Sequence, residues 1–373
     1  MRFLFIDAYY PDFLEETYRR HEGLAGEPYD DQLRELQDGL FGEAQFQVAA
    51  LRQLGHEAAT VITNAQPAQD AWAREHGLRV RAQRRIGVRM RRGLIPWPTS
   101  VAPTTNWEIV LAQARDYRPD VLYVEIMDSI PEEIRRELAR LAAFSVAQIA
   151  APFSSGSYRG YDLLISSIPG LVERFRQEGA DALLMPLAFE PSVLDRVRPG
   201  PRDVALSFVG SLSSTHPERL KVLEQLASVV ELDIWSAGGD LIRDAPRATF
   251  QGPAFGRSMY ETLGRSKVTL NVHAAWAGPD ANNLRLFEAT GMGAALVTEE
   301  AQNLSDLFEP GSEVATYRTV DEAIDVVRHL AGQPDDAVRI GKAGQARTLR
   351  DHTWLQRMTE LISALGDRHM GSG

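Results

Sequence analysis

The fold is decided by the stretch Asn282-Asn283-Leu284-Arg285-Leu286-Phe287-Glu288-Ala289-Thr290-Gly291-Met292-Gly293, which continues into Ala294-Ala295-Leu296-Val297-Thr298. A polar loop opens a short helix, two glycines end it, and a buried apolar strand follows. Arg285 and Glu288 are one helical turn apart, so both side chains project from one face of the helix. The pattern predicts a strand–helix–strand unit in which a cation and a carboxylate lie at a strand end.

This unit can bind an anion and a sugar. Free amides at a helix N-terminus favour negative charge, Arg285 can hold a phosphate, and Glu288 can accept two hydroxyls of a ribose. Asp280 lies eight positions before Glu288. The arrangement resembles the donor site of GT-B glycosyltransferases, where an acidic residue, seven intervening residues and a Glu mark the nucleotide-sugar pocket. Asp280 stands where many retaining members of that group have Glu.

Strand-like and helix-like runs alternate along the chain, which favours parallel sheets covered by helices on both faces. The predicted strands are Arg2–Asp7, Ala58–Thr63, Val121–Glu125, Val146–Ala150, Leu163–Ser166, Ala182–Met185, Val204–Val209, Leu232–Trp235, Thr249–Gln251, Val268–Val272 and Ala294–Thr298. The expected fold class is α/β of the GT-B type, with two Rossmann-like doubly wound domains facing a central cleft, where ligands bind at the carboxyl ends of the strands.

The domain boundary is predicted at the turn-rich segment Arg198-Pro199-Gly200-Pro201-Arg202. We expect residues 1–198 to form an acceptor-side domain and residues 199–350 the nucleotide-sugar domain. Residues 351–373 are expected to form a helix that crosses back to the first domain. Tyr9–Leu40 is interpreted as a long aromatic loop that closes over an acceptor, and Arg79–Thr105 as a similar loop.

The second half also resembles the CgeB-like, spore-maturation-type glycosyltransferases, from about Tyr161 to Leu365. Five segments carry the resemblance in order: Tyr161–Ser167 with Leu184–Pro191, Leu206–Ser211, Phe250–Pro253 with Lys267–His273, the Arg285–Glu288 helix, and His352-Thr353-Trp354 before Arg357. The resemblance implies a glycosyltransferase of the hexosyltransferase type that uses a nucleotide-sugar donor. Residues 1–150 match only at the level of the fold.

Candidate donor-binding residues lie at the strand ends of the second half. Gly210 and Ser211 follow the first strand of that half, where a Rossmann-type turn approaches phosphates, although an ordinary turn is the alternative. Arg219 and Lys221 lie early in the next helix and are either pyrophosphate ligands or solvated. The remaining candidates are Gly252 and Pro253, which match a loop that reads the nucleobase, together with Asp280, Asn282, Asn283, Arg285 and Glu288. Asn282 and Asn283 can equally cap the helix, and Arg285 can form a surface ion pair with Glu288.

Four residues are candidates for catalysis. Asp7, Glu125 and Asp128 lie at or just after strand ends of the first half, where a general base can reach an acceptor hydroxyl. Asp128 also precedes a helix, so helix capping is its alternative role. His273 ends a strand of the second half, and its alternative is a structural histidine. Nothing in the sequence ranks the three acidic residues firmly, with Asp128 placed ahead of Asp7 and Glu125.

The composition limits the classes of partner. The 373 residues carry a net charge of −11 and no cysteine, and 44% of them are hydrophobic. The charge disfavours nucleic-acid binding, and the absence of cysteine and of a signal-like N-terminus fits a cytoplasmic protein. No apolar run is long enough to span a bilayer. One basic run, Arg79–Arg92, is either a solvated face or a surface for an anionic acceptor or membrane.

No Asp-x-Asp motif occurs, so we expect a metal-independent transfer without a cofactor, in which Arg285 and the amides of Asn283 and Leu284 stabilise the departing diphosphate. The acceptor, a hydroxyl or amine of a glycan, small molecule or protein, is left open, as are the oligomeric state and the stereochemical outcome. Two alternatives remain on the same fold: a nucleotide-sugar 2-epimerase and a non-catalytic module that binds nucleotides or sugars.

Overall fold

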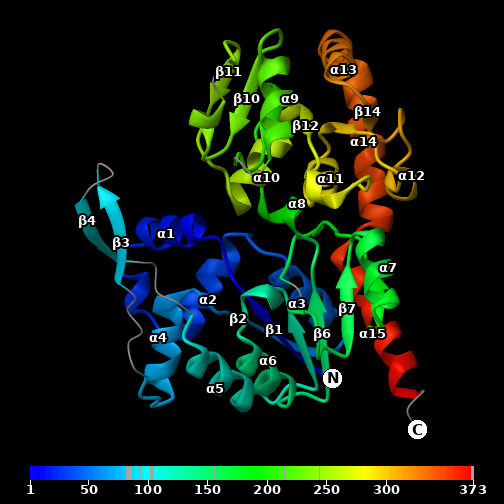
Figure 1. Cartoon of the computed structure of the whole chain (residues 1–373). Coiled ribbons are helices and arrows are strands. Elements are labelled where there is room, and N and C mark those ends of the chain that lie inside the picture. The colour runs from blue at the N-terminus through cyan, green and yellow to red at the C-terminus, as the bar shows by residue number, and fades with distance from the viewer. Residues whose placement is uncertain are drawn as a thin grey trace. The chain divides into compact units, whose positions relative to one another are not determined.

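The computed structural model describes residues 1–80, 86–91, 95–100, 105–154, 156–213, 216–242 and 244–370, with the backbone alone for 86–91, 95–100 and 369–370. The chain divides into two compact units. One unit comprises Met1–Ile149 and Phe153–Leu164, and the other Ala150–Pro152 and Ile165–Gly373. Figure 1 shows a helix-flanked sheet in each part of the chain. The predicted domain boundaries at 198/199 and 350/351 stay predictions.

The first sheet has six strands in the order β2-β1-β5-β6-β7-β8. They are β1 (Arg2–Asp7), β2 (Glu57–Ile62), β5 (Val121–Val124), β6 (Phe144–Gln148), β7 (Leu163–Ser166) and β8 (Ala182–Leu184). Strand β1 pairs in parallel with β2 and with β5. The helices of this part are α1 (Pro11–Arg20), α2 (Tyr29–Asp38), α3 (Ala44–Gln53), α4 (Gln66–Glu75), α5 (Trp107–Tyr117), α6 (Glu132–Ala139) and α7 (Pro169–Gln177).

The second sheet also has six strands, in the order β11-β10-β9-β12-β13-β14. They are β9 (Val204–Val209), β10 (Leu232–Trp235), β11 (Ala248–Phe250), β12 (Ser266–Asn271), β13 (Ala295–Glu299) and β14 (Ala315–Tyr317). The helices are α8 (Val193–Arg196), α9 (Pro217–Ala227), α10 (Gly256–Arg265), α11 (Arg285–Gly291), α12 (Leu304–Leu307), α13 (Val320–Gly332), α14 (Pro334–Asp351) and α15 (Trp354–Met370). Every neighbouring pair in this sheet is parallel, as the alternation of strands and helices predicted.

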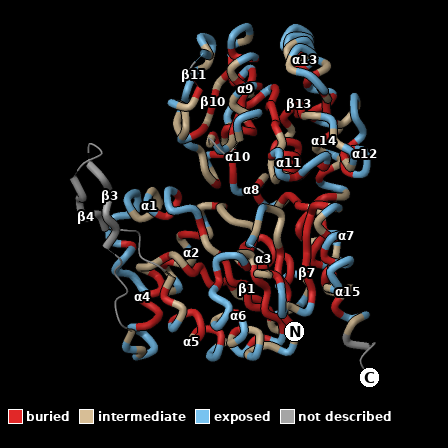
Figure 2. The backbone as a smooth tube through the Cα atoms, viewed as in Figure 1, coloured by how far each residue is buried: buried red, intermediate tan, exposed pale blue. Residues whose placement is uncertain are grey.

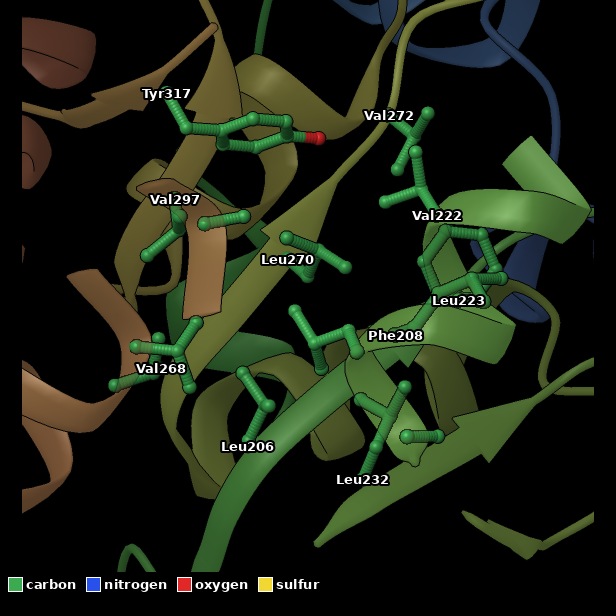
Figure 3. Close-up of a cluster of buried hydrophobic side chains, with 14 of the residues drawn as sticks. Leu206, Phe208, Val222, Leu223, Leu232, Val268, Leu270, Val272, Val297 and Tyr317 are labelled. Atoms are coloured by element: carbon green, nitrogen blue, oxygen red, sulfur yellow. The ribbon is translucent and has the colours of Figure 1, made fainter. Parts of the chain in front are cut away.

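The central strands β9, β12 and β13 of the second sheet are buried along most of their length, so their buried positions follow one another rather than alternate. Figure 3 shows Leu206 and Phe208 of β9 packed among side chains of β12 and α9, and Figure 2 shows the strands as mostly buried tube. Burying such side chains contributes about 1.5–3 kcal/mol each. This core fixes the strand ends that carry the candidate donor residues.

Two glycines hold helix α11 against its surroundings. Gly293 has φ +74°, a left-handed conformation that ends the helix before β13. Gly291 lies so close to the Phe189 ring that an added Cβ would come within 2.5 Å of it. The Gly291-Met292-Gly293 segment therefore sets the direction in which α11 enters the sheet.

The interpretation of Tyr9–Leu40 as a loop is wrong, because the segment contains the helices α1 and α2. Both helices are mostly polar and bury few apolar side chains, namely Phe13 and Leu14 in α1 and Leu36 in α2. The amphipathic pattern is present in each, but each helix has only ten residues. Tyr9 is buried, at 2% exposure, and contacts Phe13 and Phe41 edge to face, whereas Tyr10 is 61% exposed.

The Arg79–Thr105 segment is not a single loop either. Strands β3 (Ile86–Arg91) and β4 (Ile95–Ser100) pair in antiparallel fashion. Of the basic run Arg79–Arg92, the Arg79 side chain is exposed, and the other arginine side chains lie outside the described residues. The proposed roles of that run stay predictions.

Candidate functional site

An ion pair between Arg285 and Glu288 lies at the carboxyl end of β9. Arg285 Nη1 is 2.7 Å from Glu288 Oε2, and the two side chains are only 15% and 9% exposed. Arg285 Nε also donates to the Val209 carbonyl at 2.9 Å, which ties helix α11 to the strand end. Burial raises the pKa of Glu288, while Arg285 and a hydrogen bond from Tyr260 lower it. The pair is buried and positioned rather than solvated.

The two asparagines before α11 have defined structural partners. Asn283 Nδ2 donates to Asn271 Oδ1 at 2.7 Å, and Asn283 Oδ1 accepts from the Leu286 amide at 3.3 Å. Asn282 Nδ2 donates to the Ala150 carbonyl at 3.2 Å, and Asn282 Oδ1 accepts from Ser167 Oγ. Asn283 therefore acts as a cap that links α11 to β12. With seven residues, α11 is too short for a strong dipole, so Arg285 is the main source of positive charge here.

Arg219 joins two strand ends. Its Nη1 donates to the Ser211 carbonyl at 2.8 Å, and its Nη2 donates to the Val272 carbonyl at 3.0 Å. Burial lowers the pKa of Arg219, and Arg285 lowers it further. Gly210 donates its amide to Trp235 O at 3.1 Å, which fixes the turn after β9. Gly210, Ser211, Arg219 and Arg285 are thus brought together at the end of β9, and their role in donor binding stays a prediction.

Three buried nitrogen atoms have no hydrogen-bond partner among the described residues. They are Nε of Arg219 itself and Nδ1 of His216 and of His273. Arg219 lowers the pKa of both histidines, although burial is the larger cause. Burying a polar atom without a hydrogen-bond partner costs about 1–3 kcal/mol of folding free energy. A ligand that forms hydrogen bonds to these atoms recovers that cost. A guanidinium N–H with two imidazoles suits an oxyanion.

His273 is neutral at physiological pH, because burial and Arg219 lower its pKa to about 4. Its amide donates to Glu299 Oε2 at 2.6 Å, and its Nε2 lies 3.2 Å from Thr298 Oγ1. His273 also lines a cavity of about 360 Å³ at the carboxyl ends of β12, β13 and β14, together with Asp280, Glu299 and Tyr317. This volume is in the range of small-molecule sites.

The remaining candidate donor-binding residues are Gly252, Pro253 and Lys221, which have fewer defined contacts than Arg219 and Arg285. Gly252 has φ +80°, and a Cβ added to it would meet no described atom within 4 Å, so its turn after β11 is open. Pro253 is exposed next to it. Lys221 is exposed on α9, two residues beyond Arg219. Lys221 is therefore a weaker phosphate candidate than Arg219.

The three acidic candidates of the first half differ in environment. Burial raises the pKa of Asp7 to about 7, and burial, Glu43 and Asp7 raise that of Glu125. Asp128 instead accepts hydrogen bonds from the Ser154 amide at 2.7 Å and from Ser154 Oγ at 3.3 Å, which lower its pKa. A base needs a pKa near the working pH, so Asp7, whose pKa is raised to about 7, is better suited than Asp128.

Sequence reasoning missed His216, Glu299, Glu43 and Gln47. His216 lies in the same strand-to-helix turn as Gly210, and Glu299 ends β13, so the strand-end rule can find both. Glu43 and Gln47 belong to the start of α3, where only the helix was predicted. Among the described residues, no group of three His, Cys, Asp or Glu side chains is placed to hold a metal. No helix in the described part of the chain is long and apolar enough to cross a membrane.

Comparisons with known proteins agree with this architecture. Residues 219–363 match the family described as glycosyl transferase-like. Solved structures similar to the whole chain include Anabaena Alr3699/HepE in complex with UDP-glucose, at 13% identity and a TM-score of 0.62, with 98% of this chain and 100% of that one covered. A comparison with curated proteins finds no significant match.

Two further structures cover nearly the whole chain. Sucrose-phosphate synthase from Thermosynechococcus elongatus has 11% identity and a TM-score of 0.58, with 100% of both chains covered. AviGT4, a glycosyltransferase of avilamycin A biosynthesis, has 14% identity and a TM-score of 0.55, with 97% of this chain and 96% of that one covered. The protein therefore has the GT-B fold, with a glycosyl transferase-like segment in its second half.

Proposed function

We propose that the protein is a glycosyltransferase that moves a sugar from a nucleotide-diphosphate donor to an acceptor hydroxyl or amine. The observation that most directly supports this proposal is the buried Arg285–Glu288 ion pair. Nearby, Arg219 Nε and the Nδ1 atoms of His216 and His273 have no hydrogen-bond partner among the described residues. Such a site can hold a diphosphate and a ribose. The likeness to HepE, whose structure was solved with UDP-glucose, supports this donor class. We further propose that the enzyme is of the CgeB-like, hexosyltransferase type.

In the proposed reaction the bond between the anomeric carbon and the phosphate oxygen breaks, and its electron pair leaves with the diphosphate. The acceptor oxygen or nitrogen bonds to that carbon and gives its proton to a carboxylate. Arg285 and the nitrogens near Arg219 stabilise the charge on the diphosphate. Glu288 accepts the ribose hydroxyls, and the cavity beside His273 and Asp280 takes the sugar.

The assignment of domains is part of the same proposal. Residues 199–350 bind the donor, residues 1–198 bind the acceptor, and residues 351–373 connect back to the first domain. The absence of cysteine fits work in the reducing cytoplasm.

The direct test is turnover of nucleotide sugars. The full chain is screened by thermal shift against nucleoside diphosphates and then against their sugars, and hydrolysis or transfer is measured for each binder. At one hundred times the dissociation constant, a ligand stabilises the protein by about 2.7 kcal/mol. Binding of a nucleotide sugar with slow turnover supports the proposal. A folded protein that binds no nucleoside diphosphate contradicts it.

Replacement of Glu288 by Ala is expected to weaken nucleoside-diphosphate binding roughly 10- to 150-fold, because a charge-assisted hydrogen bond is worth about 1.5–3 kcal/mol. Titration calorimetry measures the loss. The matched control is Glu360→Ala, which removes a carboxylate from another Arg–Glu pair three residues apart, with Arg357 Nη1 3.1 Å from Glu360 Oε1. If folded Glu288→Ala binds the nucleoside diphosphate as tightly as wild type does, Glu288 does not bind the ribose.

Turnover is expected to continue in EDTA, because Arg285 and buried N–H groups supply the positive charge that a metal supplies elsewhere. Initial rates are compared in EDTA, magnesium and manganese after the protein is stripped of metal. A rate that vanishes in EDTA and returns with magnesium or manganese contradicts a metal-independent mechanism.

A further inference from the structure

A chain of hydrogen bonds joins the start of helix α11 to the ring of His273. Asn283 Nδ2 donates to Asn271 Oδ1 at 2.7 Å, and Asn271 Nδ2 is 3.0 Å from Thr298 Oγ1. Thr298 Oγ1 is in turn 3.2 Å from Nε2 of His273. Asn271 and Thr298 lie opposite each other on β12 and β13 and are 2% and 0% exposed. Buried polar groups are nearly always hydrogen-bonded, so each hydrogen in the middle of this chain needs an acceptor there.

The direction of the chain is fixed at its α11 end. The backbone N–H of Leu286 can only donate, and it lies 3.3 Å from Asn283 Oδ1. The oxygen of the Asn283 side chain therefore faces that amide, and its Nδ2, which can only donate, faces Asn271. Asn271 consequently presents its oxygen to Asn283 and its Nδ2 to Thr298. The orientation of both side-chain amides thus follows from a backbone donor, whose role is not exchangeable.

The Thr298 hydroxyl extends this direction to His273. Its oxygen already accepts from Asn271 Nδ2, and its single hydrogen has one acceptor among the described residues, the Nε2 atom of His273. A neutral imidazole carries a hydrogen on one nitrogen and a lone pair on the other. With the lone pair on Nε2, the hydrogen is on Nδ1. Because Nδ1 is buried and has no partner among the described residues, the ring holds an unused N–H donor.

The ring of His273 lines the cavity of about 360 Å³ at the carboxyl ends of β12, β13 and β14. Burial keeps the ring neutral at pH 7, since its pKa is lowered to about 4, so the tautomer decides whether Nδ1 donates or accepts. Arg219 lies close enough to lower this pKa, and its Nε, which can only donate, also has no partner in the described part of the chain. A ligand that satisfies both nitrogens must present acceptors, as the oxygens of a diphosphate do.

We propose that Thr298, oriented by Asn271, is a positioning residue that holds His273 as the Nδ1–H tautomer, and that this N–H donates to an oxygen of the nucleotide diphosphate. The second part of this inference rests on the proposed function, whereas the first part concerns the ligand-free protein alone. The opposite tautomer would turn a lone pair toward the phosphate oxygen. It would also leave the Thr298 hydrogen without an acceptor among the described residues.

The tautomer is measured by nitrogen NMR of the full chain, labelled with isotopic histidine, without ligand at pH 7. A His273→Gln sample identifies the signals of His273 among the 8 histidines. Thr298→Val replaces the hydroxyl by a methyl group in a side chain of similar shape, whereas Thr298→Ser keeps the hydroxyl. The matched control is Thr269→Val, which removes an equally buried hydroxyl of β12 that lies 3.0 Å from Ser207 Oγ.

Wild type, Thr298→Ser and Thr269→Val are expected to show a protonated Nδ1 and an unprotonated Nε2 in His273. Thr298→Val is expected to lose this preference, because Val has no hydrogen to donate to Nε2. An unprotonated Nδ1 in wild type overturns the inference, and so does an unchanged tautomer in Thr298→Val. The wild-type measurement decides the first part even if Thr298→Val does not fold.

Calorimetry with UDP on the same samples tests the ligand. UDP affinity is expected to fall roughly tenfold in Thr298→Val, the effect of losing one hydrogen bond to a charged group, and to stay within about twofold of wild type in Thr298→Ser and Thr269→Val. A changed tautomer with unchanged UDP affinity overturns the bond from Nδ1 to the diphosphate. Failure of wild type to bind UDP or any other nucleoside diphosphate contradicts the proposed function, and the tautomer of the ligand-free protein still reports separately on Thr298.

Discussion

Replacing Arg285 by Ala should lower kcat/KM for the nucleotide sugar by about 10²–10³, the usual effect of removing one preorganised donor from a developing oxyanion. Arg285 is held by the Val209 carbonyl at 2.9 Å and by Glu288 at 2.7 Å, so its guanidinium is positioned before the donor binds. Initial rates over a range of donor concentrations measure the loss. Because the side chain orients Glu288 as well, both kcat and donor affinity should decrease.

The Arg285 variant needs a control for general damage to the fold. Without its partner, the buried Glu288 carboxyl can become protonated, because burial already raises its pKa, so the protein is expected to remain folded. Arg265→Ala is the matched control: Arg265 forms a bidentate pair with Asp203, with both contacts at 2.8 Å, on the exposed surface of the same unit. Comparable rates for folded Arg285→Ala and wild type would show that Arg285 does not contribute to the reaction.

The sequence predicted the sheets well because parallel strands buried on both faces are continuous apolar runs. Strands β1, β7, β9 and β10 begin and end where they were predicted, and β6 lies two residues earlier than expected. Strand β14 was missed because it has only three residues. Helical spacing predicted that Arg285 and Glu288 project from one face, and their ion pair, which the sequence offered as the alternative at the surface, is buried.

The remaining features depend on tertiary contacts that a local pattern does not contain. Helices α1 and α2 bury few side chains, so a polar, aromatic segment resembled a loop. The closeness of Glu43 and Gln47 to Glu125 arises from the packing of α3 on the sheet, about 80 residues away in sequence. The catalytic and binding roles assigned to single residues stay predictions.

The two units differ in the polar groups that lie at their strand ends. In the second unit, the buried atoms without described partners near Arg219 are nitrogens of Arg and His, and basic groups lie close by. In the first unit, the corresponding atoms belong to Glu125, Gln47 and Tyr9, and carboxylates lie close by. The atoms near Arg219 thus suit an anion, whereas those of the first unit include both donors and acceptors beside carboxyl groups.

Asp7→Asn is expected to stabilise the ligand-free protein at neutral and alkaline pH by at most about 4 kcal/mol, since the Asp7 pKa rises from 3.8 to about 7 on folding and each pKa unit is worth about 1.4 kcal/mol. A raised carboxyl pKa means that the folded state binds more protons. Its contribution to stability is therefore complete below pH 3.8 and is lost as the pH rises to about 7. Asn does not titrate and keeps the acceptor for the Ala8 amide, which is 2.7 Å from Asp7 Oδ1.

The difference in unfolding free energy between Asp7→Asn and wild type should accordingly grow from about pH 4 to pH 7 and stay constant above it. Urea unfolding at several pH values measures it, and the effects of groups that do not interact with Asp7 cancel because both proteins contain them. Asp7→Asn also removes a cause that raises the Glu125 pKa. Asp181→Asn provides the opposite sign: Arg368 lowers the pKa of Asp181, so this variant should not stabilise the protein at pH 8. A difference for Asp7→Asn that is independent of pH, or that shrinks as the pH rises, contradicts the burial of an uncompensated carboxylate at the end of β1.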